Sequence, residues 1–448
     1  MIAQLIFALI FGAGIFFFSK RIAFISRNIN MGRDIDLTDR KIERWKTMAR
    51  VAVGQSKMVT RPVAGILHIL VYVGFVIINL EMLEIVIDGL LGTHRIFSDL
   101  GSIYGVLIGA FEFLALGVLV ACGVFLIRRN LIRLKRFKSK EMDGWPSLDA
   151  NIILITEILL MFAFLSMNAA DSIAISREFE HYVGTANLSG AFPISQYLVP
   201  LYSRLSDAGV IFAERGFWWF HIVGVLSFLV YVPYSKHFHI LLAFPNTYYS
   251  NLEESGRLNN MASVKKEVDL MMDPTTDPYA TAPPNTDNGE PEPPPCFGVK
   301  DGADLTWKQI MESYSCTECG RCTSVCPANL TGKALSPRKV MMDCRDRMDV
   351  IGANRDANGG EYKDDGKNLV GDYVSEEEIW ACTSCQACVD ACPINISPMG
   401  IILDMRRSLI MEDSKSPDSI TTMFNNIENN GAPWAFPAAS RGDWIKDS

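Results

Sequence analysis

The stretches Cys316-Thr-Glu-Cys319-Gly-Arg-Cys322-Thr-Ser-Val-Cys326-Pro327 and Cys382-Thr-Ser-Cys385-Gln-Ala-Cys388-Val-Asp-Ala-Cys392-Pro393 share the spacing C-x2-C-x2-C-x3-C-P. With this spacing a short loop wraps three thiolates around one face of an iron–sulfur cubane and sends the fourth thiolate to a neighbouring cluster. Two such stretches therefore predict two [4Fe–4S] clusters.

The expected ligand sets are crossed, because the fourth cysteine of each stretch belongs to the other cluster. They are Cys316, Cys319, Cys322 and Cys392, which we name site 1, and Cys326, Cys382, Cys385 and Cys388, which we name site 2. Zinc is the alternative because it also takes four thiolates, but zinc sites usually come as two C-x2-C pairs. Disulfides are disfavoured because the clusters belong in a reducing compartment.

The composition of the 448-residue chain divides it into two parts. Hydrophobic residues make up 49% of the chain, which indicates a membrane protein with a soluble appendage. Residues 1–273 carry 26 Lys/Arg against 23 Asp/Glu, whereas residues 274–448 carry 16 against 27. The soluble part is therefore acidic, which argues against a nucleic-acid partner.

Five apolar segments are each about as long as a bilayer requires. They are residues 2–18, 62–83, 103–127, 150–168 and 217–234. Basic residues follow the first segment and none precedes it. We therefore interpret it as an uncleaved first helix and not as a secretory signal.

The connecting segments predict the orientation of the chain. Residues 20–61 contain 11 Lys/Arg and residues 128–149 contain seven, whereas residues 84–102 contain one and residues 169–216 contain three. Because basic loops stay in the cytoplasm, we expect the N-terminus outside and the cysteine-rich domain in the cytoplasm. The expected location is the cytoplasmic (inner) membrane, crossed five times.

Four histidines lie in or next to these segments: His68 in the second, His221 in the fifth, and His237 and His239 just beyond the fifth. A histidine inside an apolar helix is a functional-site candidate. Neutral imidazoles from two facing helices can bind a haem iron from both sides. His68 and His239 lie toward the cytoplasmic side and His221 toward the outside, so we expect His68 and His239 to share one haem b. Satisfied core histidines are the alternative.

The surroundings of these histidines resemble the five-helix cytochrome b subunits of respiratory nitrate reductases and membrane-bound heterodisulfide reductases. The resemblance rests on His221 and His239, which are 18 residues apart, and on the local sequences Leu67-His68-Ile69, Phe220-His221, Pro233-Tyr234-Ser235 and His239-Ile240. It implies a haem shared by His68 and His239, and a second haem at His221.

The second haem is the point at which this chain departs from that family. The family's other ligand would lie ten residues after His68, where this chain has Ile78. His221 would take a ligand from His94 or His181, in the outer loops, or would bind a haem or quinone edge differently. For the first haem, His237 is an alternative to His239.

The cysteine-rich part resembles the helical two-cluster ferredoxin module found in the iron–sulfur subunit of heterodisulfide reductase, in the anaerobic glycerol-3-phosphate dehydrogenase subunit and in succinate dehydrogenase relatives. The first stretch keeps that family's glycine, Gly320, after its second cysteine, whereas the second stretch has Gln386. Between the stretches, Ser336-Pro337 and Ser375-Glu376 indicate helix starts.

These features predict an all-α protein, a five-helix transmembrane bundle followed by a helical dicluster ferredoxin domain. The expected boundaries are residues 1–245 for a cytochrome b-like domain, 246–300 for a Pro-rich linker, 301–415 for the ferredoxin domain and 416–448 for a partner-docking tail.

Two features have two interpretations each. Residues 34–58 have the pattern of an amphipathic helix, which would lie at the membrane surface or pack on the soluble domain. Glu112 and Glu157, in the third and fourth crossings, would relay protons to a quinone or be neutral carboxyls hydrogen-bonded to a neighbouring helix.

The predicted function is that of an oxidoreductase subunit. Electrons would pass between a cytoplasmic redox partner, two [4Fe–4S] clusters, haem b and the membrane quinone, with menaquinone favoured. An iron–sulfur redox sensor without quinone chemistry is the alternative. The chain has no Rossmann glycine fingerprint, so we expect the primary substrate to react on a partner protein.

The C-terminal segment is the expected docking site. In relatives of the heterodisulfide and glycerol-3-phosphate enzymes a similar Asn/Gly-Pro-Trp segment leads into a catalytic domain with Cys-Cys repeats. This chain has no Cys-Cys pair, so we expect a separate protein with the Cys-Cys repeats of heterodisulfide reductase, or a flavoprotein, to dock there. The aromatic anchors would be Phe424, Trp434, Phe436 and Trp444. A disordered tail is the alternative.

Overall fold

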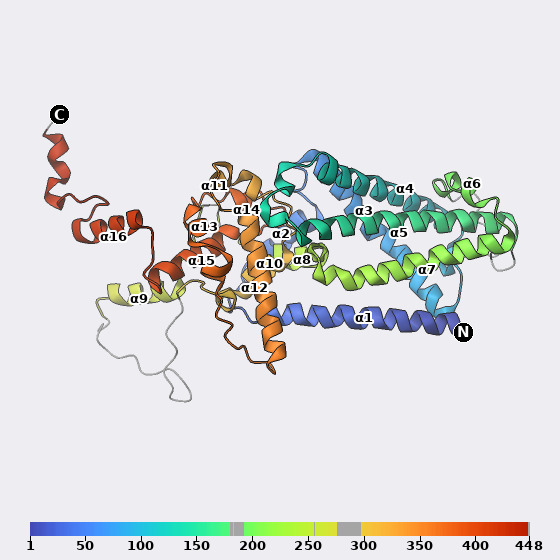
Figure 1. Cartoon of the computed structure of the whole chain (residues 1–448), viewed down its shortest axis with the longest axis horizontal. Helices are drawn as coiled ribbons and strands as arrows, with labels where there is room; N and C mark the ends of the chain where they lie inside the picture. Colours follow the sequence, from blue (N-terminus) through green and yellow to red (C-terminus); the bar gives the residue numbers. More distant parts are fainter. Residues whose placement is uncertain (180–181, 183–191, 255, 276–296, 447–448) are drawn as a thin grey trace.

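The computed structural model describes residues 1–179, 182, 192–254, 256–275 and 297–446. These residues form helices and connecting loops, with no β-strand among them. Five long helices lie side by side at one end, and the cysteine-rich part forms a second body at the other end (Figure 1). The predicted all-α architecture in two parts is confirmed.

Among the described residues, five helices are long and apolar enough to cross a membrane. They are α1 (Ile2–Ile29), α3 (Pro62–Leu91), α4 (Ser102–Leu126), α5 (Trp145–Ser176) and α7 (Asp207–Tyr231). Each overlaps one of the five apolar segments found in the sequence. The predicted number and order of the membrane helices are therefore confirmed.

The five helices pack as a closed ring in the order α1, α3, α4, α5, α7 and back to α1. Small residues permit the close approaches that hold membrane helices together. A Cβ atom on Gly89 of α3 would lie 2.5 Å from Phe7 of α1, and one on Gly224 of α7 would lie 2.6 Å from Leu160 of α5. Large apolar side chains cover the outside of the ring, where lipid can solvate them.

The amphipathic segment after α1 forms α2 (Lys41–Met48) and a π-helix, η1 (Ala49–Val53). It packs against α8 (His239–Tyr248), which follows the bundle. The buried Arg44 donates a hydrogen bond to the carbonyl of Ser250 (3.2 Å), and Trp45 meets Tyr248 edge to face. The sequence left two positions open for this segment, the membrane surface and the soluble domain. In the structure, one face of α2 packs on protein.

Six helices build the cysteine-rich body. They are α10 (Trp307–Ser315), α11 (Pro327–Leu330), α12 (Pro337–Ala357), α13 (Glu376–Ala381), α14 (Ala387–Asp390) and α15 (Pro398–Met411). Ser336 accepts a hydrogen bond from the backbone N–H of Lys339, and Ser375 forms a capping box with Glu378. Both predicted helix starts are therefore confirmed, because each serine caps amides that the helix itself leaves unpaired.

The predicted linker, residues 246–300, contains the helix α9 (Ala262–Met272), and its Pro-rich residues 276–296 lie outside the described residues. Val299 already belongs to the cysteine-rich body, because it is buried and its N–H bonds the carbonyl of Asp404 (2.9 Å). The predicted tail contains α16 (Asp418–Asn430) and the 3-10 helix η13 (Ala438–Ile445), which project away from the body (Figure 1).

Helix α1 extends beyond the bundle, and its end contacts the cysteine-rich body. Asn28, near its end, is fully buried and donates hydrogen bonds to the hydroxyl of Tyr314 (2.9 Å) and the carbonyl of Met348 (3.2 Å). Arg21 pairs with Asp349 (2.7 Å). These contacts join residues more than 280 positions apart and fix one end of the soluble body against the membrane helices.

This junction can be tested at Gly352 of α12. A Cβ atom on Gly352 would overlap the Asn28 side chain, so we expect Gly352→Ala to overpack the junction. Overpacking typically costs about 1–3 kcal/mol of unfolding free energy. Limited proteolysis should separate the two bodies faster than in the wild type. Gly442→Ala, where a Cβ would meet nothing within 4 Å, is the control, and equal cleavage of the two variants would contradict the expectation.

Candidate iron–sulfur and histidine sites

Backbone geometry turns the first cysteine stretch into a metal-binding loop. A capping box between Thr306 and Gln309 starts α10, which ends directly before Cys316. The loop then reverses at Glu318 and Gly320, whose φ angles are +53° and +69°. Glycine adopts this left-handed conformation without a Cβ clash. The reversal allows three successive cysteines of the loop to face one space.

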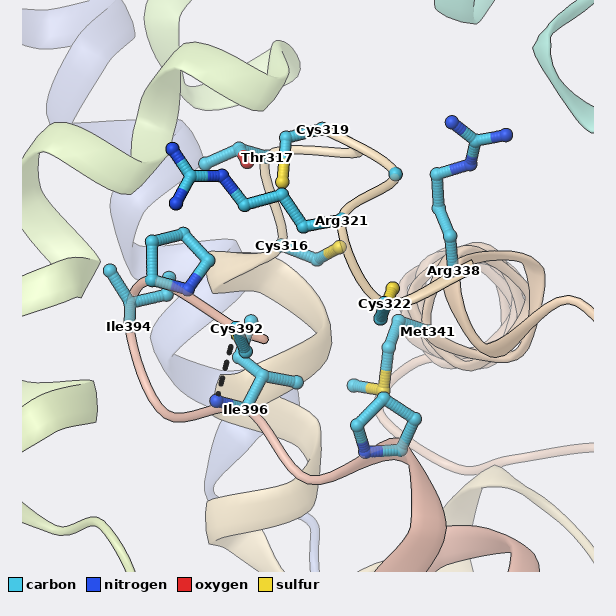
Figure 2. Close-up of a pocket in the computed structure, with 13 residues that line it drawn as sticks. Cys316, Thr317, Cys319, Arg321, Cys322, Arg338, Met341, Cys392, Ile394 and Ile396 are labelled. Carbon is cyan, nitrogen blue, oxygen red and sulfur yellow. Dashed lines mark hydrogen bonds between the residues drawn. The ribbon is translucent and has the colours of Figure 1, made fainter. Parts of the chain in front are cut away.

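Site 1 is a cavity between this loop and the end of the second stretch. Cys316, Cys319, Cys322 and Cys392 line it. The first three point into a common space from one loop, and Cys392 approaches from the neighbouring loop (Figure 2). The structure thus assembles the first crossed set that the spacing predicts.

Site 2 is a second cavity, and Cys326, Cys382, Cys385 and Cys388 line it. Cys385 is exposed, whereas Cys326 and Cys388 are buried. Gln386 takes the place of the family glycine with a φ of +62°, and its side-chain oxygen accepts a hydrogen bond from the N–H of Gly256 (2.9 Å). Site 2 therefore lies at the surface of the body and is tied to the segment after α8.

The chemistry of the cysteines fits a positively charged centre. Burial raises the pKa of the Cys316 and Cys392 thiols, and of the Cys388 thiol, to about 12. Thiolates form in such places only beside a cation, which the irons of a cluster supply. Arg321 and Arg338 also line site 1, and their charges offset the negative charge of a reduced cluster.

The choice between a cluster and zinc rests on the spacing of the cysteines along the chain, which is that of cluster ligands. A zinc ion would need four sulfurs at about 2.3 Å from one point, whereas a cubane binds each thiolate through a different iron.

Backbone amides also point at the sulfurs. The N–H of Ile396 bonds Cys392 Sγ (3.3 Å), and the N–H of Ser384 bonds Cys382 Sγ (3.4 Å). Hydrogen bonds of this kind are one of the factors that set the reduction potential of a cluster.

His68 of α3 and His239 of α8 meet at the end of the bundle that faces site 1. Their ring centroids are 6.3 Å apart. An imidazole nitrogen binds a metal at about 2 Å, so two rings on opposite sides of one iron have centroids roughly 6 Å apart. His239 donates from Nδ1 to the carbonyl of Lys236 (3.0 Å), which leaves Nε2 free to bind a metal. The structure thus brings the predicted pair together.

His237 lies beside this pair. Its ring meets His239 edge to face at 5.6 Å and lies 5.4 Å from Phe228. Burial lowers the pKa of His237 to about 3 and also lowers the pKa of His239. Both imidazoles are therefore neutral, as a metal ligand must be, and the ring facing His68 is that of His239.

The structure does not bring a second histidine to His221 among the residues that it describes. His221 donates from Nδ1 to the carbonyl of Leu160 (3.0 Å), and its ring lies 6.1 Å from Phe164. His94 instead contacts Asp171 (3.3 Å) and Arg215 (3.2 Å). His181, the other predicted substitute, lies outside the described residues.

One contact at this site was not predicted from the sequence. The Lys236 ammonium forms a buried ion pair with Glu318, which lies between Cys316 and Cys319. Burial opposes ionisation of Glu318, but Lys236 and Arg345 hold its pKa below the usual value. Lys236 also accepts the His239 hydrogen bond through its carbonyl. A single residue thus contacts both the site 1 loop and the histidine pair.

A family model described as a 4Fe-4S dicluster domain matches residues 315–396. This range contains all eight cysteines of the two sites, so the comparison supports iron–sulfur clusters in the cysteine-rich body. No solved structure matches the chain.

The chain is similar to three curated proteins that are named as oxidoreductases or as part of a reductase. It is 28% identical to the "Probable iron-sulfur-binding oxidoreductase FadF" of Bacillus subtilis, over 93% of this chain and 57% of the relative. It is 25% identical to the "EtfAB:quinone oxidoreductase" of Syntrophomonas wolfei subsp. wolfei, over 92% of this chain and 55% of the relative. It is 30% identical to one subunit of the "Ferredoxin/F(420)H(2)-dependent CoB-CoM heterodisulfide reductase" of Methanosarcina acetivorans, over 24% of this chain and 53% of the relative.

The chain spans little more than half the length of the two long relatives. Their names bear out the predicted oxidoreductase class, and the third relative bears out the resemblance of the cysteine-rich part to heterodisulfide reductase. The cytochrome b resemblance of the membrane bundle stays a prediction.

The crossed ligand sets can be tested with Cys319→Ser. We expect this variant to disturb the cluster at site 1 and to leave the cluster at site 2 intact, because Cys319 lines only the first cavity. Iron content should fall from about eight to about four atoms per chain, and EPR should retain one of two [4Fe–4S] signals. Cys344→Ser is the control, since Cys344 is buried outside both cavities. Two unchanged EPR signals in Cys319→Ser would rule out the assignment.

Proposed function

We propose that the protein is a membrane-anchored oxidoreductase subunit. It passes electrons between a cytoplasmic redox partner, [4Fe–4S] clusters at sites 1 and 2, haem b and the membrane quinone pool. The observation that carries this proposal is the spatial order of the sites. An exposed four-cysteine site is followed by a second such site, and then by a histidine pair at the end of an apolar helix bundle.

Contacts at the junction support this order. Arg321, in the wall of site 1, donates a hydrogen bond to the carbonyl of Lys57 (3.0 Å), five residues before α3 begins. Lys236 also contacts both Glu318 of the site 1 loop and His239. These contacts support an order in which site 1 lies between site 2 and the histidine pair, with the exposed Cys385 of site 2 as the point at which a partner exchanges electrons.

His68 and His239 are the residues that would hold haem b. A haem bound there supplies one-electron transfer between iron–sulfur clusters and a quinone. The chain's own part is to bring the two imidazoles together and to orient His239 through the carbonyl of Lys236. We propose one haem, because His221 faces no second histidine among the described residues. A sensor that uses its clusters as a switch would have no use for this pair beside site 1.

The proposed quinone and partner rest on the names of the relatives. The proposed orientation rests on the charge of the connecting segments. One relative is named for EtfAB and a quinone, and another as part of a heterodisulfide reductase. We propose a soluble partner of one of these two kinds and a quinone acceptor or donor, with menaquinone favoured. The basic segments around residues 20–61 and 128–149 favour a cytoplasmic position for the cysteine-rich body.

The haem assignment predicts that His68→Ala and His239→Ala each abolish the b-type optical bands. The eight cysteines lie in a separate body, so the iron–sulfur content should stay at about eight irons per chain. His237→Ala is the matched control and should keep the haem, because the ring that faces His68 is that of His239. Unchanged haem bands in both alanine variants would refute the pairing. Their absence from the wild-type protein would refute the proposed haem.

The projecting C-terminal arm, α16 and η13, is the proposed docking element for the soluble partner. Phe436 is 65% exposed and Trp444 71% exposed, and Phe424 and Trp434 are exposed as well. Exposed aromatic side chains of this kind are enriched at protein interfaces.

Truncation after Asp413 tests the arm and keeps the Lys300–Asp413 ion pair (2.7 Å) that closes the cysteine-rich body. We expect the truncated protein to retain both clusters and to lose co-purification with the partner. The comparison is with the full chain at equal iron content. Full stoichiometry of the partner, with undiminished electron transfer from it, would show that the arm is not the docking element.

A further inference from the structure

A buried polar network occupies the end of the bundle opposite the cysteine-rich body. Arg95, between α3 and α4, is at its centre. It donates hydrogen bonds to Asp171 (2.6 Å) and Asn168 (2.6 Å) of α5, and to the hydroxyl of Tyr104 (3.3 Å) of α4. Tyr104 in turn donates to Glu84 of α3 (2.5 Å).

The network reaches the other elements through two branches. In the first, Asn168 donates to Glu112 of α4 (3.0 Å), and the hydroxyl and the N–H of Ser195 donate to the same carboxylate. In the second, His94 joins Asp171 (3.3 Å) to Arg215 of α7 (3.2 Å). A continuous hydrogen-bonded path therefore links α3, α4, α5 and α7.

Glu112 is thus the member of the predicted glutamate pair that is hydrogen-bonded to neighbouring segments. Its carboxylate accepts bonds from the side chain of Asn168 and from the backbone of Ile194 (2.7 Å) and Ser195 (3.0 Å). These hydrogen bonds hold the Glu112 carboxylate in place between α5 and the segment at Ile194 and Ser195. Glu157 lies elsewhere in the bundle and belongs to neither branch.

The charges of the network do not balance. Six carboxyl groups are buried in it or beside it: Glu81, Glu84, Asp88, Glu112, Asp171 and Glu214. The guanidinium groups that face them belong to Arg95 and Arg215. Burying several unpaired carboxylates among apolar helices is too costly to persist, so some of these groups hold protons.

Glu81 is the carboxyl best placed to hold an exchangeable proton. Its residue is 3% exposed, and its Oε2 atom has no hydrogen-bond partner among the described residues. Glu81 lies on α3 one turn before Glu84, whose carboxylate accepts the Tyr104 hydrogen bond of the network. Among the described residues, no ion pair joins Glu81 to a cation, because Arg95 pairs with Asp171 and Arg215 with Glu214.

We propose that this network is a proton-binding site in which Glu81 carries the exchangeable proton. Glu81 lies at the far end of the bundle from the clusters and the histidine pair, where it would take up or release a proton when the redox state of the protein changes. That role rests on the proposed function, whereas the presence of the proton depends only on the buried charges.

Infrared spectroscopy of the full-length protein in lipid nanodiscs tests the proposal. At neutral pH the wild type should show the carbonyl band of a protonated carboxyl group that shifts after exchange into heavy water. Glu81→Gln, which keeps the size of the side chain, should lose the band of one carboxyl group. Asp99→Asn, which changes a carboxylate of the α3–α4 loop at the same end of the bundle, is the control and should keep that band.

The outcomes separate the two proposals. An unchanged band in Glu81→Gln, or its equal loss in Asp99→Asn, would overturn the proton site whatever the clusters do. If Glu81→Gln does not fold, Glu81→Asp replaces it and should shift the band. Failure of the proposed function, seen as a wild-type protein without b-type haem, would leave the infrared result unaffected.

Discussion

The buried ion pair between Lys236 and Glu318 connects the two halves of this molecule. Lys236 follows the last turn of the bundle, and Glu318 lies within the loop that forms site 1. Both groups are removed from water, so separating them would leave uncompensated charges in a poorly polarisable environment. The relative position of site 1 and the histidine pair depends on this contact.

Other contacts at the junction also hold the cysteine-rich body against the membrane helices. Asn28 of α1 holds α10 and α12 through Tyr314 and Met348, and Arg321 holds the segment before α3. Each contact joins a membrane element to the cysteine-rich body. A soluble ferredoxin module would need none of them, so their presence indicates a module that packs against membrane helices.

Local signals in the sequence predicted much of the fold. Five apolar segments predicted five membrane helices, because a helix that crosses a bilayer must be apolar over about 20 residues. Ser336 and Ser375 predicted helix starts, because a side-chain cap acts on amides two or three residues away. The sequence did not determine which surface the amphipathic segment at residues 34–58 packs against. Its partner, α8, lies far along the chain, and periodicity does not say which surface covers an apolar face.

The cysteine spacing by itself predicted two four-thiolate sites and their crossed sets, since the geometry of a cubane fixes how many residues separate its ligands, and the structure lines its two cavities with the same two sets. The sequence also identified His68 and His239 by their depth in the helices. Only the tertiary structure decided which groups surround these residues. Lys236 beside Glu318, the place of His221 without a second histidine among the described residues, and the gathering of Glu81, Arg95, Glu112 and Asp171 all depend on contacts between segments far apart in the chain. A sequence pattern reports the neighbours of a residue along the chain, whereas burial and charge pairing are settled only when helices pack.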